Sequence, residues 1–484
     1  MKKPAIRFDF NNMMKVCVGA KEGFSEKDLA SVSDTAMASY YSFDKGRGKG
    51  WMRWTELPYN QGEIVADIIA TAKDIRKRAD AFVVLGIGGS ALGPMAVFQA
   101  LKHLRHNELK RSARKAPRFY VEDNVDPERM DSLFDILDLK KTVFNVITKS
   151  GSTSETMSQY LIIMEKLKKQ FGADAKDHII ATTDEKNGNL INIAKAEGLK
   201  TFYVPDGVGG RFSELCPVGL LPAAVLGINI KEMLAGAAFM DKKCNSGNIY
   251  KNPALMAATL QILAIEKGKN ISVMMPYADS LKLMADWYCQ LWGESLGKNK
   301  DLDGKPVNVG QTPVKSLGVT DQHSQVQLYT EGPFDKVITL IGVDKYRKEV
   351  KISGGAEAYP SVSFLSGHTL NELITKEMLA TEYALTKAER LNRTIMLPEV
   401  TEFTVGQLLA FFMFETAYAG AMLNIDTFNQ PGVEEGKNAT YALFNRPGYE
   451  AKAEEIKKAP GYSVVKTKDK GEEIVKASKP KYVI

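Results

Sequence analysis

The stretch FVVLGIGGSALG, residues 82–93, decides the fold class of this 484-residue chain. Its first four residues, 82–85, are apolar and have the length of a buried strand. The turn GIGGS, residues 86–90, follows directly, and a helical segment begins at Ala91. A strand, a glycine-rich turn and a helix in direct succession are typical of the first half of a βαβ unit in a parallel sheet.

The glycines of this turn allow the backbone to approach a ligand, and they leave the first N–H groups of the helix free for an anion. Two other interpretations stay open, a tight turn whose glycines only serve packing and a dinucleotide-binding turn. The dinucleotide fingerprint GxGxxG is imperfect, because Ala91 stands at its sixth position. The acidic residues that end the next strand, Glu122 and Asp123, also come too late in the sequence.

Outward from this stretch, short β-rich segments alternate with helical segments in two series. We therefore predict an α/β fold with two doubly wound parallel-sheet domains, a helical N-terminal segment and a C-terminal extension. The predicted strands are 82–85, 119–121, 143–147, 178–181 and 201–204 in the first series, and 271–275, 336–341 and 394–397 in the second. The predicted boundaries are 1–60 for the N-terminal segment, 61–220 and 221–445 for the two domains, and 446–484 for a helix and basic tail.

Length and composition exclude several classes of protein. The chain is too long for one ordinary hydrophobic core. Its 44% hydrophobic and 25% charged residues exclude a disordered or fibrous chain. The net charge is only +6, and residues 451–484, with nine lysines against five acidic residues, contribute +4 of it. No large basic surface for nucleic acid is therefore predicted.

The cysteines and apolar stretches indicate a soluble, cytoplasmic protein that does not enter a membrane. The cysteines are far apart and form no CxxC pair, as is typical of reduced thiols. The first residues lack the apolar segment of a signal peptide. The apolar stretches 216–230 and 408–423 are shorter than a membrane span needs. The four cysteines are Cys17, Cys216, Cys244 and Cys289.

A second glycine-containing segment, KSGSTSET at residues 149–156, is rich in hydroxyl groups. Hydroxyls, backbone N–H groups and a helix N-terminus together favour a phosphate monoester. The alternative is a capping box, because Ser152 and Glu155 have the required spacing. A capping box needs only one of these hydroxyls, so the phosphate site is the preferred interpretation. The motif GxxxxGK[ST] of nucleoside triphosphate binding is absent from the sequence.

Four further segments contain one candidate residue each. In GGRFS, Arg211 can stabilise developing negative charge, or it is a surface-loop arginine. In WGESLGK, Glu294 can serve as a general base, or it is an ordinary helix-terminal glutamate. In DQHSQVQ, His323 is an acid–base candidate or a satisfied structural histidine. In FNQPGVEEGK, Lys437 is a functional or merely solvated lysine.

No HxH or HExxH spacing predicts a metal centre, and no GxSxG predicts an α/β-hydrolase.

Taken in order, GIGGSALG, SGSTSET, GGRFS and FNQPGVEEGK resemble the patterns of the glucose-6-phosphate isomerase (phosphoglucose isomerase) family. The resemblance extends from about residue 50 to about residue 450. It implies two sugar-isomerase (SIS) domains of flavodoxin-like type, with the active site in the cleft between them. It further implies a homodimer in which a neighbouring subunit completes that site, a sugar phosphate as substrate, no cofactor and no metal.

The resemblance also implies roles for individual residues. Glu294 would move a proton between C1 and C2, and Arg211 would face the enediol intermediate. His323, arriving from the partner subunit, would open the sugar ring together with Lys437. Glu214, after GGRFS, departs from the family pattern and would compete with substrate charge or point outward. The implied phosphate and substrate set is Ser90, Lys149, Ser150, Ser152 and Thr153, with Gly89 and Glu155 beside it.

Three alternative functions are also compatible with parts of the sequence. A bifunctional phosphoglucose/phosphomannose isomerase would add epimerisation at C2. A sugar-phosphate-binding regulator built from SIS domains would need the hydroxyl-rich loop but not Glu294, His323 and Lys437. A nicotinamide-dependent dehydrogenase would use the GIGGS turn but leave the second loop unexplained. The reaction that the sequence favours is the aldose–ketose isomerisation of glucose 6-phosphate and fructose 6-phosphate, a step of glycolysis and gluconeogenesis.

Overall fold

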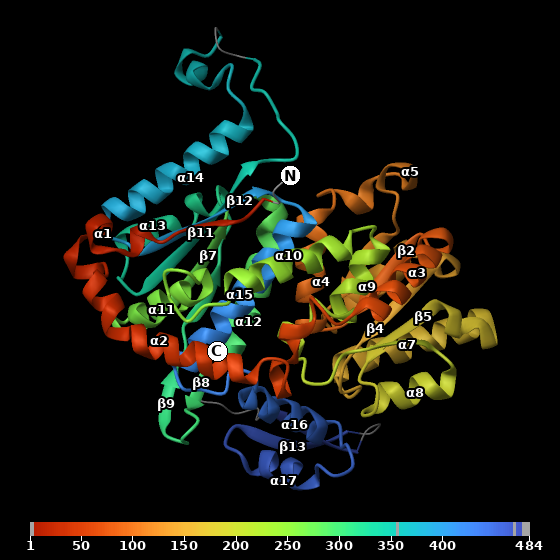
Figure 1. The fold of residues 1–484 in the computed structure, drawn as a ribbon. Coiled ribbons are helices and arrows are strands. Elements are labelled where there is room, and N and C mark those ends of the chain that lie inside the picture. Colours follow the sequence, from red (N-terminus) through yellow and green to blue (C-terminus); the bar gives the residue numbers. More distant parts are fainter. Residues whose placement is uncertain (1–3, 355–357, 468–470, 477–484) are drawn as a thin grey trace. The chain divides into compact units, whose positions relative to one another are not determined.

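The computed structural model describes residues 4–354, 358–467 and 471–476. The chain divides into two compact units, Met1–Thr427 and Phe428–Ile484, and each is described here by itself. The first unit contains two parallel sheets with their helices (Figure 1). The predicted α/β class with parallel sheets is confirmed, and the predicted domain boundaries stay predictions.

The first sheet has the strand order β3–β2–β4–β5–β6, and all its neighbouring strands are parallel. Strands β2 and β4 are buried along their whole length, as expected for central strands covered on both faces. Val83 of β2 lies opposite Tyr120 on one side and Phe144 on the other. The strands are β2 (Ala81–Leu85), β3 (Arg118–Glu122), β4 (Thr142–Ile147), β5 (Ile179–Thr183) and β6 (Lys200–Tyr203).

The predicted strands of this series all coincide with observed ones to within about two residues at each end. Helix α3 (Gly62–Arg78) precedes β2 in the chain. The helices of this half are α3 (Gly62–Arg78), α4 (Leu92–Leu101), α5 (Arg111–Arg114), α6 (Pro127–Ile136), α7 (Ser154–Phe171), α8 (Asn189–Glu197) and α9 (Pro217–Val225).

The second sheet has the order β1–β12–β11–β7–β10. Its strands are parallel except β1, which pairs antiparallel with β12 at one edge. The N-terminal segment, predicted to be helical, thus also contributes a strand. Three residues are too few to show a periodicity in the sequence. The strands are β1 (Arg7–Asp9), β7 (Ile271–Pro276), β10 (Thr312–Lys315), β11 (Lys336–Lys345) and β12 (Asn392–Glu399).

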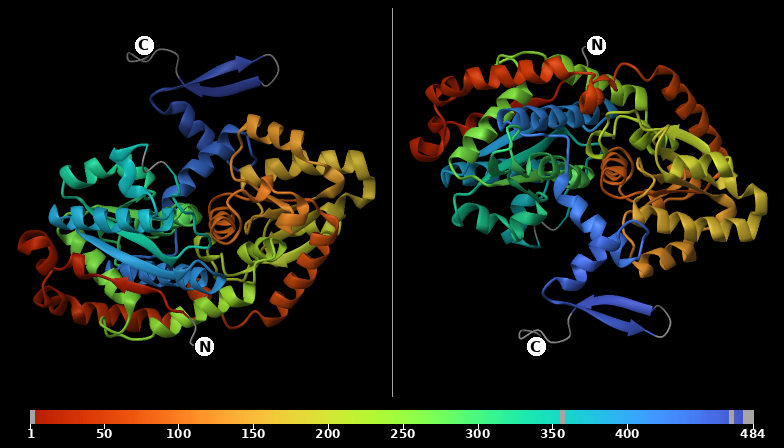
Figure 2. Two further views of the ribbon diagram at one scale, coloured as in Figure 1. Left: turned by 90° about the horizontal axis from the view of Figure 1, so that it is seen from above. Right: turned by 90° about the horizontal axis from the view of Figure 1, so that it is seen from below.

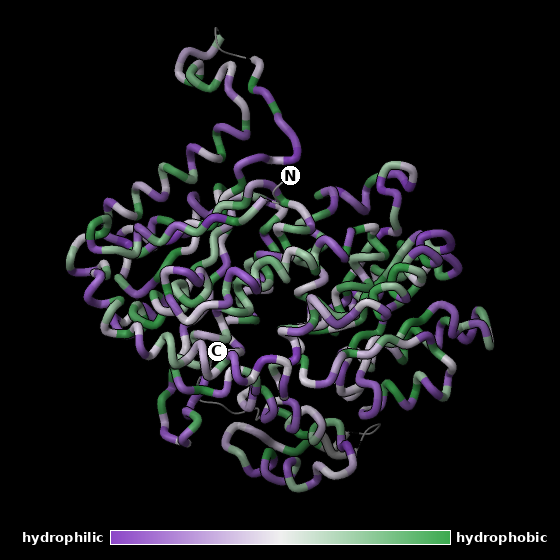
Figure 3. The backbone as a smooth tube through the Cα atoms, viewed as in Figure 1, coloured by the Kyte–Doolittle hydropathy of each residue, from purple (hydrophilic) through white to green (hydrophobic). Residues whose placement is uncertain are grey.

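Apolar helices join the two halves of the first unit. Helix α15 is buried from Phe403 to Gly420, and α10, α11 and α12 pack against it. Helix α12 also packs against α4 of the first half. Figures 1 and 2 show the two sheets on either side of these central helices, and Figure 3 shows hydrophobic residues gathered in the strands. The helices are α1 (Lys15–Glu22), α2 (Glu26–Gly46), α10 (Ile230–Lys243), α11 (Pro253–Glu266), α12 (Lys282–Leu296), α13 (Val326–Glu331), α14 (Leu370–Lys387) and α15 (Glu402–Met422).

Within the described residues, no helix combines the length and apolar character that crossing a membrane requires.

The second unit consists of two helices followed by a hairpin. Tyr441 and Tyr449 meet edge to face where the helices pack, and Arg446 lies over the Tyr441 ring. The basic tail predicted from the sequence forms the hairpin in part, and its last residues, 477–484, lie outside the described residues. The elements are α16 (Glu434–Leu443), α17 (Glu450–Lys458), β13 (Tyr462–Thr467) and β14 (Gly471–Lys476), the two strands being antiparallel.

Candidate active site

The first sheet has a topological switch point between β2 and β4. From β2 the chain continues to β3 on one side, whereas from β4 it continues to β5 and β6 on the other. Loops after adjacent parallel strands at such a point leave the same edge in opposite directions and open a crevice. The two loops predicted to bind phosphate follow β2 and β4, so the fold places them at this crevice.

The loop after β2 is pressed against the segment that contains Arg211. Residues Gly88–Ser90 form a single 3-10 turn before α4. A Cβ on Gly89 would lie 2.2 Å from the carbonyl carbon of Gly210. Only glycine permits this approach, because any side chain would force the two backbones apart. The phosphate loop and the arginine loop are therefore fixed to each other by direct backbone contact.

The loop after β4 is ordered by its own hydroxyl groups. Thr153 is the N-cap residue of α7, yet its side chain makes no capping bond and instead pairs with the Thr148 hydroxyl at 2.9 Å. The N–H of Ser152 donates to Ser150 Oγ at 3.2 Å. The alternative interpretation predicts a capping box with Ser152 as the N-cap residue. In the structure Thr153 is the N-cap residue, and no capping box forms at this helix. Several hydroxyls thus gather at the start of α7, where the helix dipole favours an anion.

Lys149 connects this loop to the chain just before the arginine loop. Its Nζ donates to the carbonyl of Val208 at 3.1 Å. The same ammonium lies 4.9 Å from the centre of the Trp51 ring. A lysine held between a carbonyl and an aromatic face keeps a fixed position beside the predicted phosphate site.

Arg211 is buried, with a side chain only 2% exposed, so the surface-loop alternative is wrong. Its Nε donates to Ser295 Oγ at 2.7 Å, and its Nη2 donates to the Thr427 carbonyl at 2.6 Å. Its Nη1 reaches Glu294 Oε1 at 3.2 Å. Burial lowers the pKa of the Arg211 guanidinium, while Glu294 and Asp426 raise it in part. Two separate segments, α12 and the chain at Thr427, hold this guanidinium in one orientation.

Glu294 lies in the last turn of α12, and its side chain is 26% exposed. One carboxylate oxygen faces Arg211, and the other accepts from Gln290 Nε2 at 3.0 Å. Both oxygens are thus oriented, while 26% of the side chain stays exposed to solvent. An oriented, accessible carboxylate beside a fixed cation can abstract a proton next to a carbonyl and stabilise the resulting negative charge.

Sequence reasoning missed three residues around this carboxylate, namely Gln290, Ser295 and Lys298. The spacing of Gln290, Glu294 and Lys298 at four-residue intervals was a usable signal, because such residues share one side of a helix. Lys298 Nζ donates to the carbonyls of Glu294 and Ser295 at 2.9 and 2.7 Å. Burial, followed by the neighbouring Arg211 charge, lowers the pKa of Lys298 to about 8.

The structure does not bring His323 to this pair, and Lys437 belongs to the second unit. His323 ends a 3-10 turn in the second half and is exposed. Within the described residues, no hydrogen bond or ion pair joins its side chain to Arg211 or Glu294. Lys437 lies in α16 of the second unit, where its Nζ pairs with Glu434 Oε1 at 2.8 Å.

Glu214 does not point outward, and it does not contact the arginine that it follows closely in sequence. Its side chain is buried beneath the loops, and neither carboxyl oxygen has a hydrogen-bond partner in the described structure. Burial raises the pKa of this carboxyl well above its usual range. A neutral carboxylic acid does not compete with the substrate for the Arg211 charge.

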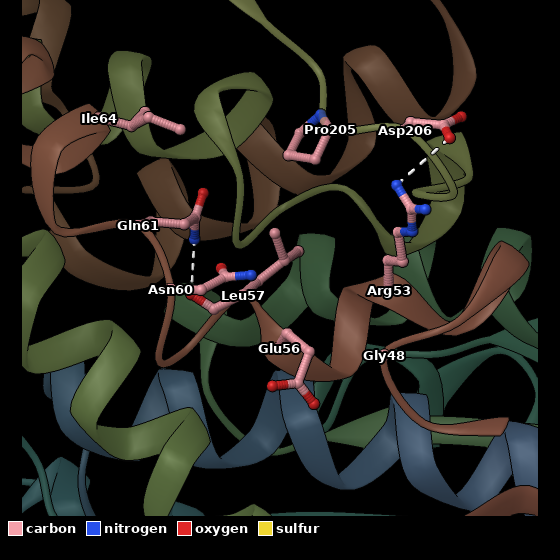
Figure 4. A pocket seen from close by; sticks show the side chains of 9 residues that line it. All are labelled: Gly48, Arg53, Glu56, Leu57, Asn60, Gln61, Ile64, Pro205 and Asp206. Carbon is pink, nitrogen blue, oxygen red and sulfur yellow. Dashed lines mark hydrogen bonds and ion pairs between the residues drawn. The ribbon is translucent and has the colours of Figure 1, made fainter. Parts of the chain in front are cut away.

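Two cavities lie outside this constellation, and neither is lined by Arg211 or Glu294. The smaller, of about 360 Å³, lies between the N-terminal segment and the chain after β6, where Arg53 and Asp206 pair at 3.3 Å (Figure 4). The larger, of about 980 Å³, follows β7 and β11 of the second sheet. Among the described residues, no group of three or more His, Cys, Asp or Glu side chains could hold a metal ion.

Comparison with known proteins identifies relatives along most of the chain. The family profile described as phosphoglucose isomerase matches residues 70–458. A glucose-6-phosphate isomerase of Carboxydothermus hydrogenoformans is 54% identical over 454 residues, which is 94% of this chain and 98% of the relative. One from Rubrobacter xylanophilus is 41% identical, over 92% of this chain and 99% of the relative.

Solved structures show the same fold. A hypothetical protein from Thermus thermophilus superposes with a TM-score of 0.81 at 34% identity, covering 90% of this chain and 99% of that one. A glucose-6-phosphate isomerase from Chlamydia trachomatis superposes with a TM-score of 0.70 at 21% identity, covering 87% of this chain and 80% of that one.

Proposed function

This chain belongs to the phosphoglucose isomerase family, and on that premise we propose how its residues interconvert glucose 6-phosphate and fructose 6-phosphate. The observation that carries the proposal is the Arg211–Glu294 pair, held at 3.2 Å next to the crevice with the two loops. The activity itself, glucose-6-phosphate isomerisation, follows from the family. The assignment of steps to residues is our proposal.

The two loops of the first sheet hold the substrate phosphate. Backbone N–H groups at the start of α4 and α7 and the loop hydroxyls donate to the phosphate oxygens, and Lys149 adds a positive charge. Binding the phosphate, which does not react, holds the open-chain sugar while its other end changes shape. The residues assigned to this function are Gly89, Ser90, Lys149, Ser150, Ser152 and Thr153, with Glu155 in the first turn of α7.

Glu294 transfers the proton. Starting from the open-chain aldose, its carboxylate removes the C2 proton, the electron pair forms the C1–C2 double bond, and the carbonyl oxygen becomes an enediolate. The proton of the C2 hydroxyl passes to the C1 oxygen, so that the negative charge moves to the C2 oxygen. The carboxylic acid then returns its proton to C1 on the same face, and the electron pair of the C2 oxygen forms the ketose carbonyl. Arg211 stabilises the enediolate with a charge that the protein has already oriented, so no metal is needed for this step.

Ring opening precedes this transfer and requires an acid and a base at the hemiacetal. We assign it to His323 and Lys437. His323 is exposed in this chain, and among the described residues its side chain makes no hydrogen bond or ion pair with Arg211 or Glu294. This supports a homodimer in which His323 of a second copy completes the site.

The decisive experiment follows the conversion of fructose 6-phosphate to glucose 6-phosphate in excess chelator, with a coupled dehydrogenase as the readout. Wild-type protein should turn over, and Glu294→Gln should not, while the variant still binds inorganic phosphate. Loss of wild-type turnover in chelator would contradict the metal-independent step. Turnover by the variant at the wild-type rate would show that another group is the base.

A further inference from the structure

Glu214 is a deeply buried acid close to this site. The proposed mechanism assigns it no role. The residue is 2% exposed, and it lies three positions after Arg211. Neither Oε1 nor Oε2 has a hydrogen-bond partner among the described residues. An unpaired polar group at such a depth destabilises the folded state, so its presence calls for a compensating role.

Two glycines make the space that this carboxyl occupies. A Cβ on Gly93, the second residue of α4, would lie 2.2 Å from Glu214 Oε2. A Cβ on Gly219, the third residue of α9, would lie 2.3 Å from the same oxygen. The carboxyl therefore fills a notch between the first turns of two helices, and it fits only because both positions lack a side chain.

The notch holds the carboxyl away from other charges. Helices α4 and α9 contain no titratable side chain. The Cys216 thiol at the cap of α9 interacts electrostatically with this carboxyl, and burial raises the pKa of the thiol to about 12. The Arg211 guanidinium is directed instead to Ser295, Glu294 and Thr427. Burial raises the pKa of the Glu214 carboxyl well above its usual range.

This contact is the second of two that join the phosphate loop to the arginine loop. The first is the backbone contact between Gly89 and Gly210. The second, between Gly93 and Glu214, lies four residues further along both segments. The two contacts lie on either side of Ser90 in the first segment and of Arg211 in the second. A displacement at either contact therefore changes the distance between the proposed phosphate site and the guanidinium.

We propose that Glu214 is a positioning residue for the isomerisation, whose neutral carboxyl fills the notch between α4 and α9 and thereby keeps the Ser90 loop in register with Arg211. The proposal rests on the function proposed above, because it assigns the Ser90 loop to the substrate phosphate. Its predicted consequence is that shortening the side chain weakens phosphate binding more than it slows the chemical step.

Steady-state kinetics of two variants test this role. Glu214→Gln keeps the shape and the neutrality of the group and should retain KM and kcat. Glu214→Ala should raise KM for fructose 6-phosphate about tenfold and raise the inhibition constant of inorganic phosphate in parallel, with kcat reduced less than about threefold. An alanine variant with wild-type KM and phosphate inhibition would overturn the proposal, because a merely structural role predicts that outcome.

A compensating substitution tests the contact itself. Gly93→Ala places a methyl group against the Glu214 carboxyl and should weaken phosphate inhibition and lower the melting temperature. Adding Glu214→Ala should recover part of both losses, because it removes the carboxyl atoms that the methyl group meets and leaves room for that methyl group in the notch. If the double variant is no better than Gly93→Ala alone, the two residues are not coupled as proposed.

The pH dependence of stability gives a readout that does not depend on turnover. The folded protein holds a proton on Glu214 that the unfolded chain releases above about pH 4.5, so folding loses stability as the pH rises from there. The melting temperature of Glu214→Gln should exceed that of wild type by an amount that grows from pH 5 to pH 9. A constant difference would show that the carboxyl is ionised in the folded state. A different outcome is also possible: wild type fails to isomerise fructose 6-phosphate, while this difference in melting temperature still grows with pH. In that case the assigned reaction is wrong, whereas the inference that the buried carboxyl is protonated still holds.

Discussion

Two arginine–glutamate pairs lie in the two halves of the first unit, and they differ in how much water reaches them. Arg211 and Glu294 meet at 3.2 Å, with side chains 2% and 26% exposed. Arg393 of β12 and Glu415 of α15 meet at 2.6 Å, with side chains 1% and 0% exposed. The sequence gives no sign of this difference, because each glutamate lies within an apolar helical segment.

The surroundings of the two pairs explain what each can do. Arg393 donates also to Thr339 Oγ1 at 2.9 Å, and burial raises the pKa of Glu415 even though Arg393 lowers it. That pair is enclosed on all sides by helix α15 and the second sheet, so no substrate reaches it. In the Arg211 pair the cation is enclosed but the carboxylate remains accessible. An ion pair in which only the cation is fully buried can take part in catalysis. An ion pair in which both partners are fully buried contributes only to the folded structure.

Removing the accessible carboxylate should have the largest effect on function. Glu294→Gln should lower kcat by at least about 1,000-fold, because the amide cannot accept the proton. The melting temperature should change by only a few degrees, since Thr427 and Ser295 still hold Arg211. Parallel kinetics and thermal melts check both parts. A variant that unfolds before its activity can be measured would show that this pair, too, is mainly structural.

Removing the enclosed carboxylate should lower stability strongly and leave activity unchanged. Glu415→Gln leaves the Arg393 charge buried without its partner and should lower the free energy of unfolding by about 3–5 kcal/mol. The kcat/KM of the remaining folded protein should stay at the wild-type value. Denaturant unfolding with activity assays of the native fraction measures both. As the matched control, Arg393→Met combined with Glu415→Leu should recover most of the lost stability.

Changing the shape of the accessible pair's cation should have a smaller effect than removing its base. Arg211→Lys keeps the charge but cannot donate to Ser295, Glu294 and Thr427 together, and should lower kcat/KM about 100-fold. Steady-state kinetics with fructose 6-phosphate gives the value. An effect under about threefold would mean that charge alone, and not the guanidinium geometry, stabilises the intermediate.

Lys298 should make the stability of the accessible site depend on alkaline pH. Its pKa is lowered to about 8 in the folded protein, against an ordinary value of 10.5. Between these values the unfolded chain binds more protons, so the contribution of Lys298 to stability rises with pH. The melting temperature of wild type minus that of Lys298→Met should therefore increase from pH 8 to pH 10.5. A difference that is flat across this range would contradict the lowered pKa.

The smallest effect is expected for the hairpin of the second unit. Deleting residues 462–484 removes the hairpin β13–β14 and should leave kcat and KM within about twofold of wild type, the usual range for surface changes. The assay is the same coupled reaction. A collapse of activity would show that the hairpin shapes the site or the contact between subunits.

Much of this architecture could be predicted from the sequence, because β2 is a continuous apolar run and β4 is apolar except for Thr142 and Asn145, and turn residues follow both strands. The two loops at the switch point were also predictable, since glycine and hydroxyl residues stand where strands end. The partners of Arg211 could not be predicted in this way, because Ser295 and Thr427 approach it from segments more than eighty residues away in the sequence. The burial of Glu214 depends on Gly93 and Gly219, and only the packing of their helices reveals that.

The strand β1 has a consequence for how the chain is made. Arg7 pairs with Met396 across the edge of the second sheet, and the N–H of Ile6 donates to Gln407, a residue 401 positions later. At synthesis rates of about 5–20 residues per second, about 20 to 80 seconds separate the synthesis of the two partners. Until then strand β1 has no partner in the sheet and is open to association with other chains. Residues 6–9 are thus made before their partners, and they are placed only when the residues up to Gln407 exist.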